Sequence, residues 1–181
     1  MSTDPIFSNP RLVKIYDAFD SNRDDLLPYV ELVKEHKASK VTDLGCGTGV
    51  LALRLVEDGV DVTGVDPAKA SIDIAKSKPN ANKANWVVGG ASALVAESAD
   101  LVVMTGNVAQ AIVEPEQWDE TLRNVRSALK PGGHLIFETR NPDARAWEEW
   151  NKEESFQSIP VHGLGLVDGW VELTKVALCL V

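Results

Sequence analysis

The stretch Val41-Thr42-Asp43-Leu44-Gly45-Cys46-Gly47-Thr48-Gly49 decides the fold of this chain. Its first four residues predict a short buried strand, and Asp43 places a carboxylate near the end of that strand. The three alternating glycines predict a turn with almost no side-chain bulk. Leu51, Leu55 and Val56 follow at helical spacing, so a helix is expected directly behind the turn. Such a turn lets a ligand lie against backbone N–H groups at the positive end of a helix.

Two glycine-rich phosphate-binding motifs do not match this turn. Dinucleotide enzymes use G-x-G-x-x-G, whose last glycine lets the helix pack against the strand. Here that position is Val50, which disfavours an NAD-binding oxidoreductase. The glycines are not followed by G-K-[ST] either, so a cradle for a nucleoside triphosphate is excluded. A tight structural turn in an unrelated α/β protein remains the alternative to a ligand site.

Residues 43–49, Asp-Leu-Gly-Cys-Gly-Thr-Gly, resemble motif I of the class I S-adenosylmethionine-dependent methyltransferases. Residues 129–135, Leu-Lys-Pro-Gly-Gly-His-Leu, resemble the approach to the fifth strand of that family, and the resemblance covers about residues 38–140. It implies an α/β fold, a doubly wound, mostly parallel Rossmann-like sheet with helices on both faces and an antiparallel strand near the C-terminus. It also implies S-adenosylmethionine as the cofactor and methyl transfer to a small soluble acceptor.

Composition narrows the class of partner. The chain has 181 residues and a net charge of −9 at pH 7, which argues against nucleic acid because such binding rests on clustered Lys and Arg. It has no apolar run of about 18 residues and no apolar signal-peptide region, so no membrane is expected and a cytoplasmic location is predicted. Its two cysteines, Cys46 and Cys179, cannot build a disulfide framework. The oligomeric state is left open.

The N-terminal part is expected to be helical after a polar arm that ends at Pro10. Leu12, Ile15, Tyr16 and Phe19 share one helical face, as do Leu26, Tyr29, Val30 and Val33 further on. The resemblance implies that residues 1–37 form a lid and residues 38–181 the core of a single domain. Tyr16 and Arg23 are the residues of the lid that could touch the cofactor. The alternatives are that Tyr16 fills the core and that Arg23 is solvated.

Asp66 ends a second predicted strand, Val60 to Val65, about twenty residues past the glycine loop. Nucleotide-binding folds grip ribose hydroxyls with a carboxylate at this place, and Pro67 fixes the backbone beside it. Asp66 could also cap the next helix, expected from Ala68 to Lys78. By the resemblance, Asp43 orders the loop or reaches the methionine amino group through water. The loop residues that would support the methionine part are Gly45, Cys46, Gly47, Thr48 and Gly49.

Two further turns follow strand ends and complete the predicted site. After the strand Trp86 to Val88, the turn carries Ala91 and Ser92 where the family usually has an acidic residue that meets adenine. Adenine recognition is then left to backbone groups around Gly90 or to the Ser92 hydroxyl. The apolar strand from Ala99 ends in a loop in which Thr105, Gly106 and Asn107 are candidate cofactor contacts. Asn107 and Gln110 are candidates for contact with the substrate. The alternative for Asn107 is that its side chain satisfies the loop backbone.

The remaining elements are predicted from apolar spacing and turn residues. Pro115 opens a helix in which Trp118, Leu122, Val125 and Leu129 share a face, and Lys130 to Gly133 ends it. The predicted elements beyond it are a strand from His134 to Thr139, a helix from Asp143 to Lys152 and a sixth strand from Trp170 to Val181. Either residues 159–166 supply one more strand to the sheet, or a partner subunit covers its edge.

No catalytic residue is assigned from the sequence, and no metal site is expected. The sulfonium of the cofactor makes its methyl group electrophilic, so the enzyme mainly holds a nucleophile in line with it. His162 is the only titrating candidate for a general base. Arg23, Arg140 and Arg145 could bind an anionic acceptor, unless each pairs with a neighbouring carboxylate. A non-catalytic, nucleoside-binding regulatory protein is the alternative function.

Overall fold

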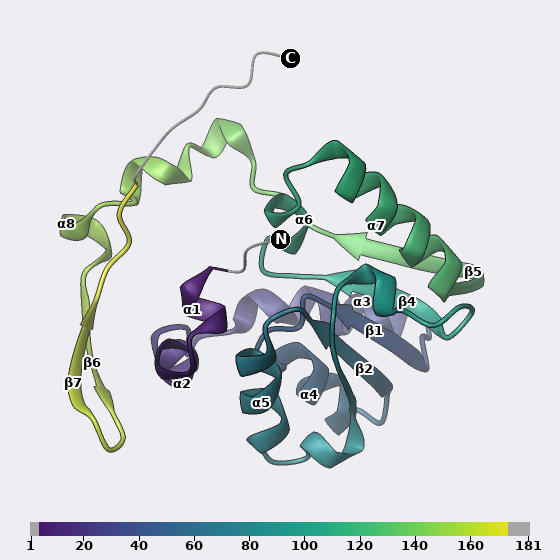
Figure 1. Ribbon diagram of the computed structural model, residues 1–181, viewed down its shortest axis with the longest axis horizontal. Helices are drawn as coiled ribbons and strands as arrows, with labels where there is room; N and C mark the ends of the chain where they lie inside the picture. The colour runs from purple at the N-terminus through teal and green to yellow at the C-terminus, as the bar shows by residue number, and fades with distance from the viewer. Residues whose placement is uncertain (1–3, 174–181) are drawn as a thin grey trace.

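The computed structural model describes residues 4–173, and a five-stranded parallel sheet forms its centre (Figure 1). The order along the sheet is β3-β2-β1-β4-β5, and each neighbouring pair is parallel. The strand bounds are Lys40–Leu44 for β1, Asp61–Asp66 for β2, Asn85–Val88 for β3, Ala99–Met104 for β4 and Leu129–Phe137 for β5. From β1 the chain adds β2 and β3 on one side, and it then adds β4 and β5 on the other side. The strand order therefore reverses between β1 and β4, which is where ligands bind in open α/β sheets.

Helices cover both faces of the sheet, as predicted. The α-helices are α1 (Pro5–Ser8), α2 (Pro10–Phe19), α3 (Leu27–Glu35), α4 (Val50–Glu57), α5 (Lys69–Ser77), α6 (Val108–Ala111), α7 (Pro115–Ala128) and α8 (Lys152–Ser155). Short 3-10 turns lie at Asp24–Leu26, Ala81–Lys83, Ala91–Ala93, Pro142–Ala144 and Ala146–Glu149. No helix within residues 4–173 has the length and apolar character needed to cross a membrane, and the cytoplasmic location stays a prediction.

Strand β4 shows why its sequence is a continuous apolar run. Leu101 and Val103 point into one core with α3 and α4, whereas Val102 and Met104 point into a second core with Val125 of α7. Side chains of a strand alternate between its two faces, so burial on both faces requires apolar residues at every position. The doubly wound fold class predicted from the sequence is thus confirmed.

The N-terminal helices begin earlier than the sequence predicted. The polar arm expected up to Pro10 contains α1, whose first turn is capped by the Asp4 side chain accepting from the Ile6 N–H at 2.9 Å. The Asn9 side chain caps α2 in the same way by accepting from the Arg11 N–H at 2.9 Å. The buried residue of α2 is Val13, which the predicted apolar face omitted. The residues of the predicted face, Leu12, Ile15, Tyr16 and Phe19, are only partly buried.

The amino ends of three strands are tied together by one carboxylate, Asp100. It accepts hydrogen bonds from the backbone N–H groups of Ser39 and Lys40 at 3.0 and 2.9 Å and pairs with Lys130 at 2.6 Å. The bond to Lys130 holds the pKa of Asp100 well below its usual range. Strand β5 already begins at Leu129, so the prediction that residues 130–133 precede the strand was wrong. A register shift against β4 absorbs these residues.

The chain beyond β5 differs most from the prediction. The helix expected from Asp143 to Lys152 is absent because Arg145 takes a left-handed φ of 47°, which divides the segment into two 3-10 turns. Strands β6 (Gln157–Val161) and β7 (Gly165–Gly169) form a separate antiparallel hairpin, so residues 159–166 do not add a strand to the main sheet. Figure 1 shows this hairpin as an arm beside α2. Residues 170–173 carry no strand, and the rest of the predicted sixth strand lies outside the described residues.

Candidate functional site

The glycine loop lies where the carboxyl ends of β1 and β2 meet. The backbone N–H groups of Gly45 and Cys46 both donate to the Val65 carbonyl of β2, at 2.7 and 3.1 Å. The Gly49 N–H closes the turn onto the Cys46 carbonyl at 2.8 Å. The loop is therefore fastened to the sheet before the first turn of α4 begins.

The three glycines of the loop have different surroundings. All three have positive φ, which favours glycine at each position. A Cβ at Gly45 would overlap the Val108 side chain, and one at Gly49 would overlap Trp86. A Cβ at Gly47 would meet nothing within 4 Å. Packing thus excludes side chains at 45 and 49, whereas Gly47 borders open space that a ligand can use.

Asp66 holds the glycine loop by its side chain. Its Oδ2 accepts from the Gly47 N–H at 2.9 Å, and its Oδ1 accepts from the Ala68 N–H at 2.7 Å. Burial raises the pKa of Asp66, and these two hydrogen bonds oppose the rise. Each carboxylate oxygen keeps a further lone pair with which it can accept from a ligand hydroxyl.

Asp43 lies beneath the loop and is almost completely buried, with 1% of its surface exposed. Within the described part of the chain, its Oδ1 is the buried side-chain oxygen or nitrogen atom that has no hydrogen-bond partner. Burial, and secondarily the charge of Asp66, raise the pKa of Asp43 to about 7. A buried acceptor without a donor is costly, so this oxygen fits a cationic or hydrogen-bonding ligand group above it.

Two loop residues have side chains with other roles. Cys46 is buried, and its burial raises the pKa of the thiol far above its usual range, so it is not a nucleophile. The Thr48 hydroxyl donates to Asp17 Oδ1 of α2 at 2.5 Å. Lys78 then pairs with Asp17 Oδ2 at 2.5 Å and donates to the Thr48 carbonyl at 2.9 Å. These contacts fasten α2 to the loop, and the sequence prediction missed Asp17 and Lys78.

Tyr16 and Arg23, the two predicted lid residues, both contact carboxylates of the N-terminal segment. The Tyr16 hydroxyl donates to Asp20 at 3.3 Å, its ring meets Phe7 edge-on at 5.3 Å, and burial raises its pKa to about 12. Arg23 pairs with Asp20 at 3.4 Å and with Asp25 at 3.1 Å. The charge of Arg23 also lowers the pKa of Asp43. The structure therefore brings Arg23 toward the loop and packs the Tyr16 ring against Phe7.

The turn after β3 is joined to β2 through its backbone. The Gly89 N–H donates to the Asp66 carbonyl at 3.0 Å, and the Ala93 N–H donates to the Gly90 carbonyl at 3.0 Å. Ala91 packs against the core beneath α7, whereas Ser92 is exposed. A Cβ at Gly90 would meet nothing within 4 Å, so the backbone at Gly90 borders open space.

The loop after β4 contacts Glu138, a residue directly after β5 that the sequence prediction missed. Its Oε1 accepts from the Asn107 N–H at 2.6 Å, and its Oε2 accepts from the Tyr29 hydroxyl. The predicted substrate residue Gln110 instead accepts from the Arg140 N–H at 2.9 Å. A carboxylate at the carboxyl end of a strand was the available signal for Glu138, as it was for Asp66.

The other candidates lie further along the chain. Arg145 pairs with Glu148 at 2.5 Å, as the alternative reading expected, whereas the Arg140 guanidinium lies 4.9 Å from the centre of the Trp150 ring. His162 is exposed in the turn that joins β6 and β7. Within residues 4–173, no group of three or more His, Cys, Asp or Glu side chains could hold a metal ion.

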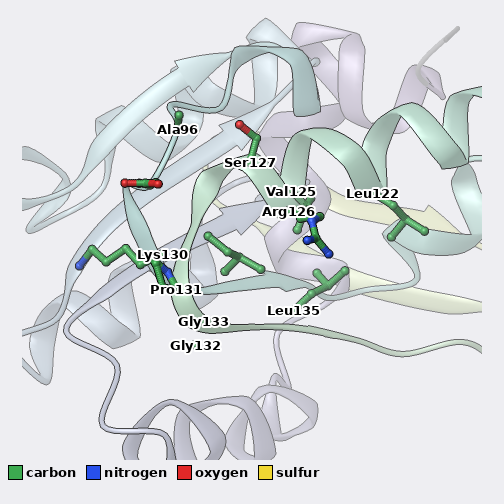
Figure 2. A pocket seen from close by; sticks show the side chains of 12 residues that line it. Ala96, Leu122, Val125, Arg126, Ser127, Lys130, Pro131, Gly132, Gly133 and Leu135 are labelled. Carbon is green, nitrogen blue, oxygen red and sulfur yellow. The ribbon is translucent and has the colours of Figure 1, made fainter.

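A pocket of about 660 Å³ lies elsewhere, between the second half of α7 and the start of β5. Figure 2 shows Leu122, Val125 and Arg126 of α7 on one side of it and Leu135 on the other. Gly132 and Gly133 line it as well, at the amino end of β5. The glycine loop lies at the carboxyl ends of the strands, so this pocket is not the predicted cofactor site.

Comparison with known proteins agrees with this arrangement. A family model described as a methyltransferase domain matches residues 41–133. The chain therefore belongs to the methyltransferase-domain family, and the predicted resemblance to class I S-adenosylmethionine-dependent methyltransferases is confirmed. The solved plantazolicin methyltransferase BpumL in complex with SAH shares the fold, with a TM-score of 0.63, 18% identity and coverage of 83% of this chain and 62% of that one.

Two curated relatives have about 31% identity to this chain. They are the cypemycin N-terminal methyltransferase of Streptomyces sp, over 77% of this chain and 59% of that protein, and the glycine N-methyltransferase of Rattus norvegicus, over 62% and 44%. The chain thus spans about half the length of the curated relatives it matches.

Proposed function

We propose that the protein transfers a methyl group from S-adenosylmethionine to a small soluble acceptor. The observation that carries this proposal is the pairing of Gly47, which borders open space, with Asp43, whose buried Oδ1 has no partner within residues 4–173. One feature explains both: a ligand with a cationic end lying against the loop. When bound, the cofactor supplies a methyl group on sulfur that a nucleophile can attack.

Different residues of the chain would bind the ribose, methionine and adenine parts of the cofactor. Asp66 would accept from the ribose hydroxyls while it keeps its hydrogen bond to the Gly47 N–H, and Pro67 would fix its backbone. The loop from Gly45 to Gly49, with Cys46 and Thr48, would support the methionine part, together with Asp43 and Arg23. The adenine end would rest on Gly90, Ala91 and Ser92, and Tyr16 would close one side of the cofactor. Thr105, Gly106 and Asn107 would border the sulfur end of the cofactor, where the acceptor enters.

We also propose that residues 1–37 act as a lid on a core formed by residues 38–181. Support comes from the contacts of Asp17 with Thr48 and Lys78, which join α2 to both the loop and α5. An uncharged side chain in place of Asp17 would lose the ion pair with Lys78 and weaken this closure. Asp17→Asn should therefore speed the release of S-adenosylhomocysteine, measured by stopped-flow displacement, with little change in melting temperature.

The acceptor is proposed to carry an anionic group that Arg140 binds. Arg23 and Arg145 have carboxylate partners, whereas no carboxylate pairs with Arg140 in the part of the chain that the structure describes. An arginine stacked on an aromatic ring keeps its N–H donors free for a carboxylate. The amine or hydroxyl to be methylated would lie nearer the Asn107 loop, and a base is needed only if that group must lose a proton first.

The proposal is tested in two stages. Calorimetric titration with S-adenosylhomocysteine and with NADH should give binding of the first and not of the second. Labelled methyl transfer is then followed to glycine, to a peptide with a free N-terminal amine and to a catechol. Failure to bind S-adenosylhomocysteine would refute the proposal, and binding without transfer to any acceptor would favour the regulatory alternative.

A further inference from the structure

Glu138 joins three segments near the carboxyl ends of β4 and β5. It follows β5 directly, is partly buried, and each of its carboxylate oxygens accepts one hydrogen bond. One donor is the Asn107 backbone N–H at 2.6 Å, and the other is the Tyr29 hydroxyl of α3. Hydrogen bonds to a charged acceptor are about twice as strong as neutral ones. Glu138 is therefore well placed to fix the loop between β4 and α6, which lies beside the end of β5 (Figure 1).

That loop needs such a support because its backbone is unusual. Gly106 and Asn107 have φ values of 68° and 65°, so two consecutive residues lie in the left-handed region. Asn tolerates this region better than most residues, yet it still costs free energy. The N–H of the second of these residues, Asn107, has Glu138 as its acceptor. Without that carboxylate, the loop would lose the contact that favours this conformation.

The next residue fixes the other end of the loop. The Val108 side chain packs directly over Gly45, where even one added Cβ would overlap it. The loop is thus held at Val108 from the cofactor side and at Asn107 from the Glu138 side. The glycine loop keeps its own bonds to Val65 and Asp66, so it does not depend on Glu138.

The bonding of Glu138 fixes the orientation of its side chain. One oxygen accepts from the loop after β4 and the other from α3, so the carboxylate is held in place by two contacts. Burial, and secondarily the hydrogen bond to Glu138, raise the pKa of Tyr29 well above its usual value, so the tyrosine stays a donor. The pair acts as a fixed support rather than as a proton relay.

We propose that Glu138 is a positioning residue that holds the Gly106–Asn107 loop for the methyl acceptor and ties it through Tyr29 to α3. This inference rests on the proposed function, because it is the acceptor side of that site which the loop borders. It predicts a defect in the placement of the acceptor without a defect in cofactor binding.

The test compares Glu138→Ala, Glu138→Gln and Tyr29→Phe with Glu120→Ala, a substitution on the exposed face of α7. Amide hydrogen exchange is measured by NMR, and S-adenosylhomocysteine affinity by calorimetry. In Glu138→Ala the Asn107 amide should exchange at least about tenfold faster, while Val103 in β4 is unchanged. Glu138→Gln should restore most of the protection, since its amide oxygen still accepts. Tyr29→Phe should have a smaller effect, because the bond to Asn107 remains.

The affinity for S-adenosylhomocysteine should stay within about threefold in all four variants. For whichever of glycine, the peptide and the catechol is methylated, Glu138→Ala should lower kcat/KM and Glu138→Gln should recover it. Unchanged exchange at Asn107, or faster exchange throughout the sheet, would overturn the proposal. Should Glu138→Ala fail to fold, Glu138→Asp provides the same comparison because its shorter side chain cannot reach both donors. A wild-type protein that binds no S-adenosylhomocysteine would refute the proposed function. The hydrogen-exchange measurement would still show whether Glu138 holds the Asn107 loop.

Discussion

Two regions of this molecule, residues 41–107 and residues 140–173, differ in how firmly they are held. In residues 41–107, buried strands end in Asp43 and Asp66, and a carboxylate or carbonyl receives the N–H groups of the glycine loop. In residues 140–173, two 3-10 turns and a hairpin lie beside the sheet, and the aromatic side chains of Phe156 and Trp170 remain exposed. The first region is built from local strand-to-helix units, whereas the second depends on what packs against it.

The largest expected effect separates the two regions with matched glycines. Gly47 and Gly163 both have positive φ, and an added Cβ meets nothing within 4 Å at either position. Gly47→Val and Gly163→Val should therefore impose a similar backbone cost. Only Gly47→Val should abolish S-adenosylhomocysteine binding, because its side chain would fill the space beside the loop. Calorimetry and melting temperatures measured on both variants check this expectation.

Equal loss of binding in the two glycine variants would mean that backbone strain far from the loop is enough to prevent binding. Normal binding by a folded Gly47→Val protein would place the cofactor elsewhere. Either outcome would remove the basis for treating residues 41–107 as the cofactor region.

The second effect concerns the pH dependence of stability. The pKa of Asp43 is raised to about 7 by burial first and by Asp66 second, with the Ala52 N–H and the charge of Arg23 acting against the rise. An unfolded aspartate titrates near about 4. Between these values the folded state holds a proton that the unfolded state has lost, so stability falls as the pH rises from about 4 to 7. Each pKa unit corresponds to about 1.4 kcal/mol.

Asp43→Asn should remove this decline, and denaturant unfolding at a series of pH values measures it. Asp100→Asn is the control, because the lowered pKa of Asp100 gives stability that is lost only as the pH falls below the usual range of a carboxyl group. The same decline between pH 4 and 7 in wild type and in Asp43→Asn would contradict the assignment.

The third effect is a loss of affinity at Asp66. If its carboxylate accepts from the ribose hydroxyls, Asp66→Ala should weaken S-adenosylhomocysteine binding by several-fold to about a hundredfold, since such bonds are worth about 1.5–3 kcal/mol each. The bond from the Gly47 N–H is lost in the same variant, so a modest fall in melting temperature is expected as well. Asp168→Ala in β7, which is exposed, is the control. Unchanged affinity in Asp66→Ala would sink the ribose assignment.

The contrast between the regions also explains what the sequence could predict. The glycine loop, Asp66 and the strands around them follow from turn chemistry and apolar runs, which are local signals. The contacts of Asp17 with Lys78 and of Tyr29 with Glu138 join residues far apart in the sequence, and no local pattern pairs them. The helix predicted from Asp143 was wrong because apolar spacing does not register the left-handed backbone at Arg145.

The smallest expected effect asks whether the second region contributes to the site at all. Arg140 lies over Trp150, and a carboxylate on the acceptor would find its N–H groups available. If glycine is methylated, Arg140→Met should raise the KM for glycine by about tenfold, the worth of one charge-assisted contact. It should leave the KM for glycinamide, which has the same amine and no carboxylate, unchanged. Arg145→Met is the matched control, because Arg145 already pairs with Glu148. An equal change for glycine and glycinamide would show that Arg140 only packs on Trp150, and the acceptor site would then belong to the first region alone.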